Sequence, residues 1–217
     1  SECVGEIQLS RQSLNIRNRV CGFYGKIPAV GDFVSRGLTT EMVSRLDVWL
    51  TEYVSSLPSL LPNYDSYWQD APIWRFVAAT GIFSSHICIG LLTNSYDAVG
   101  RMFPLVILYE LSSEKELEYI LLNDNNSTWL LDLEDVIYAT RHQYLDSDKL
   151  LKVINRLNPL DNELCESDLN TISSIWLKCL KLIQSQGSLW WYEGKNTTTY
   201  CEYTKLPRCA DFVKYYG

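Results

Sequence analysis

Lys26 follows two closely spaced glycines, a combination that could bind a phosphate group through backbone N–H groups and an ammonium. A phosphate-binding P-loop, however, has four residues between its glycines and a Ser or Thr after the lysine to hold magnesium. Here two residues separate Gly22 from Gly25, and Ile27 follows the lysine. The segment is therefore predicted to be a structural turn and not a nucleotide site.

Carboxylates, histidines and thiols are present, but not in the arrangements that catalysis or metal binding needs. Asp132, Glu134 and Asp135 form an acidic cluster in a helical pattern without a nearby histidine, which is typical of a solvated helix face. His86 and His142 stand in no nucleophile–base context, and no Gly-x-Ser-x-Gly elbow occurs. The seven cysteines are odd in number and lack a Cys-x-x-Cys pair, which predicts free thiols in a reducing compartment. We therefore expect no enzyme activity, no metal and no cofactor.

The composition points to one acidic domain with a sizeable core. The chain has 217 residues, 47% of them hydrophobic, and a formal net charge of −7. No run of Lys and Arg occurs, which argues against a nucleic-acid partner. The longest apolar segments, Ile87–Leu92 and Pro104–Leu108, have the length of strands, so no membrane insertion is expected.

The pattern of the chain predicts an α+β fold, with a mainly antiparallel central sheet flanked by helices in a single domain. The strand-like runs in the middle of the chain are joined by connections too short for a parallel crossover, which needs a dozen or more residues. The expected strands are Val20–Tyr24, Ile73–Ala79, His86–Thr93, Phe103–Glu110, Ser188–Tyr192 and Thr198–Tyr203.

Helical spacing predicts helices on the flanks of this sheet. The first begins at a cap formed by Thr39 or Thr40 and is expected to end at Pro58 and Pro62. Residues 1–19 are expected to form a flexible N-terminal arm or a non-native remnant, ahead of a domain at 20–217. The expected helices are 41–56, 113–122, 128–142, 147–157, 167–186 and 208–215.

Five motifs, in order along the chain, resemble the TagF/ImpM family, accessory proteins of bacterial type VI secretion. They are Gly22–Phe33 with Arg36-Gly37, Asp47-Val48-Trp49, Ala71–Phe76, Val99–Pro104 and Ser188–Trp191. The resemblance covers about residues 21 to 215, so the domain at 20–217 is expected to be TagF/ImpM-like. Within these motifs we expect the structural residues to be Gly31, Asp32, Phe33, Arg36, Asp47, Trp49, Gly100, Pro104, Trp190 and Trp191.

The resemblance implies a cytoplasmic, non-enzymatic protein that regulates assembly or firing of the secretion apparatus after translation. Family members are thought to act by binding the forkhead-associated scaffold protein of the system. Some relatives carry a fused phosphatase domain, for which this chain has no room.

Trp74, Arg75 and Arg101 are the candidate partner-binding residues, because exposed Trp and Arg contribute strongly to interfaces. Asp32 is expected to pair with Arg36 or Arg101, or else to cap a turn or helix, and so to stabilise the loop after the first strand. The alternative hypothesis is a small-molecule-binding or hydrolytic domain with a pocket around Asp32, Arg36 and Arg101.

Overall fold

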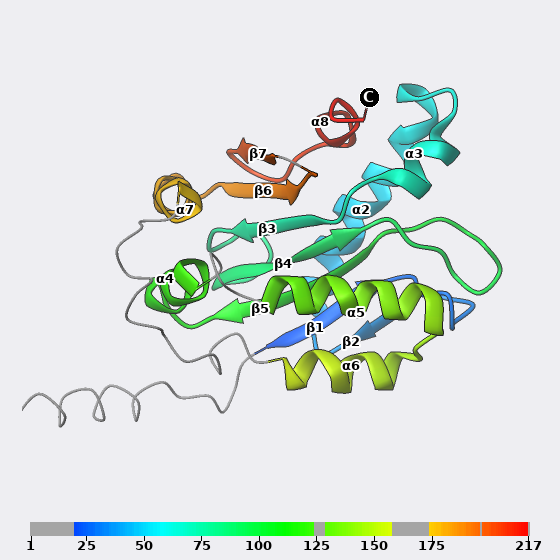
Figure 1. The fold of residues 1–217 in the computed structure, drawn as a ribbon, viewed down its shortest axis with the longest axis horizontal. Helices are drawn as coiled ribbons and strands as arrows, with labels where there is room; N and C mark the ends of the chain where they lie inside the picture. Colours follow the sequence, from blue (N-terminus) through cyan, green and yellow to red (C-terminus); the bar gives the residue numbers. More distant parts are fainter. Residues whose placement is uncertain (1–19, 124–128, 158–173, 196, 217) are drawn as a thin grey trace, which may run out of the picture.

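A seven-stranded sheet organises the molecule, in the order β2-β1-β5-β4-β3-β6-β7 (Figure 1). All neighbouring strands are antiparallel. The computed structural model describes residues 20–123, 129–157, 174–195 and 197–216. The strands are β1 (Cys21–Gly25), β2 (Val34–Arg36), β3 (Trp74–Ala78), β4 (Ile87–Thr93), β5 (Leu105–Leu111), β6 (Ser188–Glu193) and β7 (Thr198–Tyr203).

Helices cover both faces of the sheet and make three layers. In Figure 1, α5 and α6 lie in front of the sheet and α2 lies behind it. Apolar side chains of α4, α5, α6 and α7 share one hydrophobic cluster with one face of the sheet, and those of α2, α3 and α8 share a second cluster with the other face. The helices are α2 (Thr40–Leu60), α3 (Tyr64–Asp70), α4 (Glu114–Asn123), α5 (Trp129–Gln143), α6 (Ser147–Arg156), α7 (Ser174–Gln184) and α8 (Cys209–Val213).

Successive strand residues supply the two clusters, because side chains alternate between the faces of a sheet. Trp190 packs against Phe76 and Trp49 on the α2 side, with ring centroids 4.7 and 5.4 Å away. Trp191 lies in the opposite cluster, and both tryptophans are fully buried. In the central strand β4 every residue is buried, so it is a continuous apolar run without polar alternation.

The predicted α+β class, with its antiparallel sheet between helices, is confirmed. Thr39 is the N-cap of α2 and accepts a hydrogen bond from the N–H of Met42. The expectation that Pro58 ends this helix is wrong, since α2 continues to Leu60. The N–H of Leu61 still bonds to the carbonyl of buried Leu57, so the proline removes a donor only in the last turn.

Two elements were not expected from the sequence. Strand β2 has three residues, of which only Val34 is buried, and such a short segment carries no periodic signal. Helix α3 lies between two proline-containing segments and buries Tyr67 and Trp68. Of the long helix expected at 167–186, the structure shows α7 from Ser174, and the earlier part lies outside the described residues, as do residues 1–19.

Candidate functional site

Two loops meet at one end of the sheet, on the right in Figure 1. One joins β1 to β2 and the other joins β4 to β5. The N–H of Ala98 in the second loop donates to the carbonyl of Val30 in the first, at 2.9 Å. The first loop contains residues 26–33 of the motif Gly22–Phe33, and the second contains the motif Val99–Pro104, so the fold brings together two motifs that are distant in the sequence.

The carboxylate of Asp97 is the centre of this loop pair. Its side chain is 0% exposed and accepts from Lys26 Nζ at 2.9 Å and Arg101 Nε at 2.7 Å. It also accepts from the backbone N–H groups of Val99 and Arg101, at 3.1 and 2.9 Å. The tight turn between them uses Gly100 at φ +86°, a conformation that favours glycine.

These donors determine the charge state of Asp97. Burial by itself would raise the pKa of this carboxyl group, but the Arg101 N–H, the Lys26 ammonium and the Arg101 side chain together lower the pKa well below its ordinary value. The group is therefore a carboxylate at neutral pH. The buried Asp97 carboxylate thus binds two cations, Lys26 and Arg101, and connects the two loops.

Phe33, Val99 and Arg101 project from this framework, and we call these three residues the double-loop surface. Phe33 is 45% exposed although its ring contacts Phe103 edge-on, with centroids 4.7 Å apart. Val99 is 72% exposed at the tip of the turn, and the Arg101 side chain is 59% exposed. Arg101 also donates to the carbonyl of Gly31, so an exposed guanidinium is fixed to both loops.

The predicted pairing of Asp32 with an arginine is wrong. Asp32 is exposed, and its carboxylate accepts from the N–H of Phe33 at 2.8 Å, which leaves only the turn-capping alternative. Arg36 instead bonds to Asp148 of α6, and Arg101 bonds to Asp97. The sequence does contain a signal for Asp97, since an Asp four residues before an Arg, with a glycine between, suits a side-chain-capped turn.

Two of the three candidate partner-binding residues lie in the interior. Trp74 packs among aromatic rings of β6 and α8, and Arg75 is buried under α5. Arg75 Nε bonds to Glu134 at 2.8 Å, and its Nη1 lies 3.5 Å from Glu193. The expectation that Trp74 and Arg75 form an exposed surface is therefore wrong, whereas Arg101 is exposed as expected.

The other motif residues have structural contacts. The hydroxyl of Tyr24 donates to Asp47, and Trp49 Nε1 donates to the carbonyl of Pro207 at 2.8 Å. The carbonyl of Pro104 accepts from the N–H of Lys26 at 3.4 Å, which joins the start of β5 to the loop after β1. These contacts fix α2, α8 and the β1–β2 and β4–β5 loops to the sheet.

An open cleft of about 850 Å³ lies away from the double-loop surface. It is lined by α2, the β3–β4 turn and the segment that joins β7 to α8, with Trp49, Tyr53 and Leu206 among its residues. Asp32, Arg36 and Arg101 do not line it. The cleft therefore gives no support to a pocket built from these three residues.

The thiols in the described part of the chain are buried and unpaired. Cys21, Cys88, Cys179, Cys201 and Cys209 are free, as predicted, and Cys3 and Cys165 lie outside the described residues. Burial raises the pKa of Cys88, Cys179 and Cys209 to about 12, so these thiols are protonated and poorly nucleophilic at neutral pH. Among the same described residues, no group of three His, Cys, Asp or Glu side chains could hold a metal.

A family model described as the TagF N-terminal domain, type VI secretion system-associated, matches residues 22–157. The matched stretch is more than half of the chain and includes both loops of the double-loop surface. The chain belongs to the TagF family. It is thus a type VI secretion-associated protein, and the resemblance seen in the motifs is confirmed. Four of the five motifs lie inside the matched stretch, and Ser188–Trp191 lies beyond it.

The fold of this TagF chain is similar to the crystal structure of PA0076 from Pseudomonas aeruginosa PAO1. The two superpose with a TM-score of 0.67 at 24% identity, over 89% of this chain and 92% of that chain. The shared fold therefore extends past residue 157. No curated protein matches the chain significantly. Within the described residues, none of the helices has the length and apolar character needed to cross a bilayer.

Proposed function

We propose that this TagF chain regulates assembly or firing of type VI secretion after translation, by binding another cytoplasmic component of the apparatus. The forkhead-associated scaffold protein is the partner that the family resemblance implies. The observation that carries the proposal is the TagF match over residues 22–157.

The double-loop surface is the proposed contact site. An exposed phenylalanine, an exposed valine and an exposed arginine stand together, and aromatic and Arg side chains are frequent anchors of protein interfaces. Because Asp97, Lys26 and Gly31 already hold the loops, little conformational freedom is lost on binding. This surface replaces Trp74 and Arg75 as the candidate for mutation, and it retains Arg101.

The proposal assigns no catalytic step to the chain. The high pKa of the buried thiols and the pairing of Arg36 and Arg101 with aspartates in structural contacts support a binding role. The alternative was a hydrolytic or small-molecule site around Asp32, Arg36 and Arg101. It is weakened because these side chains bond to three different partners, namely the N–H of Phe33, Asp148 and Asp97 respectively.

Binding of the purified forkhead-associated protein to the full chain, measured by isothermal titration calorimetry, tests the proposal. Phe33→Ser and Val99→Glu should each weaken binding at least tenfold, since both side chains are exposed. Because the Phe33 ring also contacts Phe103 and Tyr24, circular dichroism should first show that Phe33→Ser is folded. Leu177→Ser is the matched control, because Leu177 is equally an exposed apolar residue but lies on α7. It should bind as the wild type does.

A secretion assay in the bacterium gives the second readout. Deletion of the gene and overexpression should change secretion in opposite directions, and overexpressed Phe33→Ser should lose its effect. Unchanged secretion in both strains, together with no binding to the forkhead-associated protein, would refute the proposed function. Binding that survives both surface substitutions would refute the assigned surface.

A further inference from the structure

The two edges of the sheet are protected very differently. Edge strand β2 has three residues, packs beside α6, and is tied to it by the Arg36–Asp148 bond at 3.1 Å. Edge strand β7 has six residues, Thr198–Tyr203, and is the outermost strand beyond β6 (Figure 1). It contains no Pro or Lys, which commonly prevent an edge strand from pairing with another chain, and no Gly, which weakens a strand. In the part of the chain that the structure describes, no strand pairs with its outer side.

The hairpin geometry shows which backbone groups of β7 point outward. The N–H of Gly194 donates to the carbonyl of Thr197, so these residues form a hydrogen-bonded pair at the hairpin end. Hydrogen-bonded pairs recur at every second residue of an antiparallel ladder. Thr199, Cys201 and Tyr203 therefore bond to β6, in agreement with the register Trp190↔Cys201. The N–H and C=O groups of Thr198, Tyr200 and Glu202 point away from β6.

We propose that two copies of this chain dimerise by antiparallel pairing of their β7 strands, centred on Tyr200. In this register Tyr200 faces Tyr200 of the second copy, and Thr198 faces Glu202. Each of the three outward N–H groups and three outward carbonyls on one strand then meets its complement on the other, which gives six hydrogen bonds around a two-fold axis. Shifting the register leaves some of these groups unmatched.

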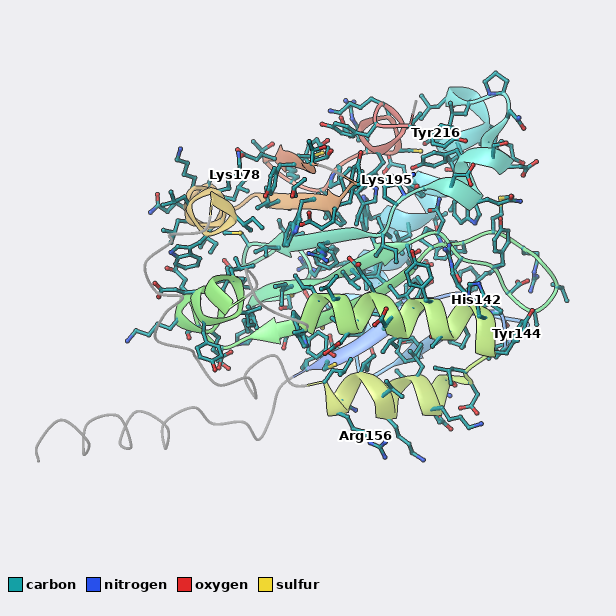
Figure 2. The ribbon with its side chains drawn as sticks, viewed as in Figure 1. His142, Tyr144, Arg156, Lys178, Lys195 and Tyr216 are labelled. Atoms are coloured by element: carbon teal, nitrogen blue, oxygen red, sulfur yellow. The ribbon has the colours of Figure 1, made fainter. Side chains whose placement is uncertain are left out.

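Side chains on the face of β7 that carries Thr198, Tyr200 and Glu202 suit this pairing. Glu202 bonds to Lys178 of α7 at 2.9 Å, and the same ammonium lies 5.5 Å from the centre of the Tyr200 ring. Figure 2 shows Lys178 on α7, near the β6–β7 pair. The carboxylate of Glu202, the one acidic residue of the strand, is thus paired with a cation. In the proposed dimer it lies opposite Thr198 and not opposite a second carboxylate. The register avoids a like-charge clash in a chain whose formal net charge is −7.

The dimer surface shares no residue with the double-loop surface, so dimerisation and partner binding can succeed or fail separately. Analytical ultracentrifugation of the full chain at increasing concentration should show a mass rising from 25.0 kDa toward twice that value. Tyr200→Pro should hold the mass at 25.0 kDa, since proline lacks the outward N–H while the bonds to β6 come from neighbouring residues.

Tyr200→Thr is the matched control, because it also removes the ring but keeps the N–H and the strand preference. It should still dimerise. Hydrogen exchange of the wild type should show protection of the Thr198, Tyr200 and Glu202 amides that increases with concentration. A wild-type chain that stays at 25.0 kDa throughout overturns the proposal without any variant, and so does a folded Tyr200→Pro chain that dimerises as the wild type does.

Discussion

Replacing Asp97 by Asn removes the one buried anion that joins the two loops. The Asp97 side chain is 0% exposed and its partner Lys26 is 7% exposed, so Asn leaves an ammonium in the interior without its counter-charge. Breaking a buried ion pair in this way costs about 3–5 kcal/mol of unfolding free energy. Asn keeps an oxygen for the N–H groups of Val99 and Arg101, so we expect about 3 kcal/mol, the lower end of this range.

Urea unfolding followed by circular dichroism measures this loss. With a slope of about 2.5 kcal/mol per molar urea, the midpoint of Asp97→Asn should fall by roughly 1 M. The control is Asp148→Asn, which breaks an exposed pair with Arg36 and should cost less than about 1 kcal/mol. The double variant Lys26→Met with Asp97→Asn should recover part of the loss, because no charge is then left buried.

Two results would contradict this account of the loop pair. The first is an Asp97→Asn chain that loses less than about 1 kcal/mol, as exposed pairs do. The second is a double variant that is as unstable as the single one, since the stranded Lys26 charge would then not be the cause.

The remaining predictions concern pH, one glycine and the thiols. The folded pKa of Asp97 is lowered, while an unfolded aspartate has a pKa of about 3.9. The contribution of Asp97 to stability is therefore present above about pH 4 and is lost as the pH falls toward the folded pKa. Unfolding free energy should therefore decrease more steeply below about pH 4 in the wild type than in Asp97→Asn. Gly37→Ala should lower the free energy of unfolding, measured in urea, by about 1–3 kcal/mol. The reason is that Gly37 has a φ of +74° and that an added Cβ would lie 2.1 Å from the carbonyl oxygen of Cys21. Gly31→Ala is the control and should be nearly neutral, because an added Cβ there meets open space. Cys88 and Cys179, whose pKa is raised to about 12, should react slowly with a thiol reagent in the native chain, and the denatured, unreduced chain should show all seven thiols. Recovery of five or fewer thiols would show disulfides.

Periodicity predicted the elements that bury a regular apolar stripe. Leu46, Leu50 and Leu57 recur at helical spacing, and all three are buried on α2. The adjacent residues Trp190 and Trp191 lie in different clusters, as the alternation of side chains along a strand requires. Such features depend on neighbours in the sequence, so local spacing is enough to find them.

The polar contacts of the site could not be predicted in the same way. Three aspartates, Asp32, Asp47 and Asp97, lie in or beside the motifs and are possible partners of Arg101. The choice depends on which carboxylate the turn buries beside Lys26, and Lys26 reaches it from a different loop. The role of Arg75 also depends on burial. The alternating pattern of strand β3 fits an arginine that faces solvent as well as one that is covered by α5 and bonds to Glu134.

The sequence by itself determined the family, the α+β class and the antiparallel neighbours, because motifs, spacing and short connections are properties of consecutive residues. Tertiary structure alone decided the order of the seven strands, the Lys26–Asp97–Arg101 cluster and the exposure of Phe33 and Val99. The physical reason is that pairing between distant strands and burial of a charge depend on the whole packed core. Two loops become one surface only when β1 and β5 lie side by side.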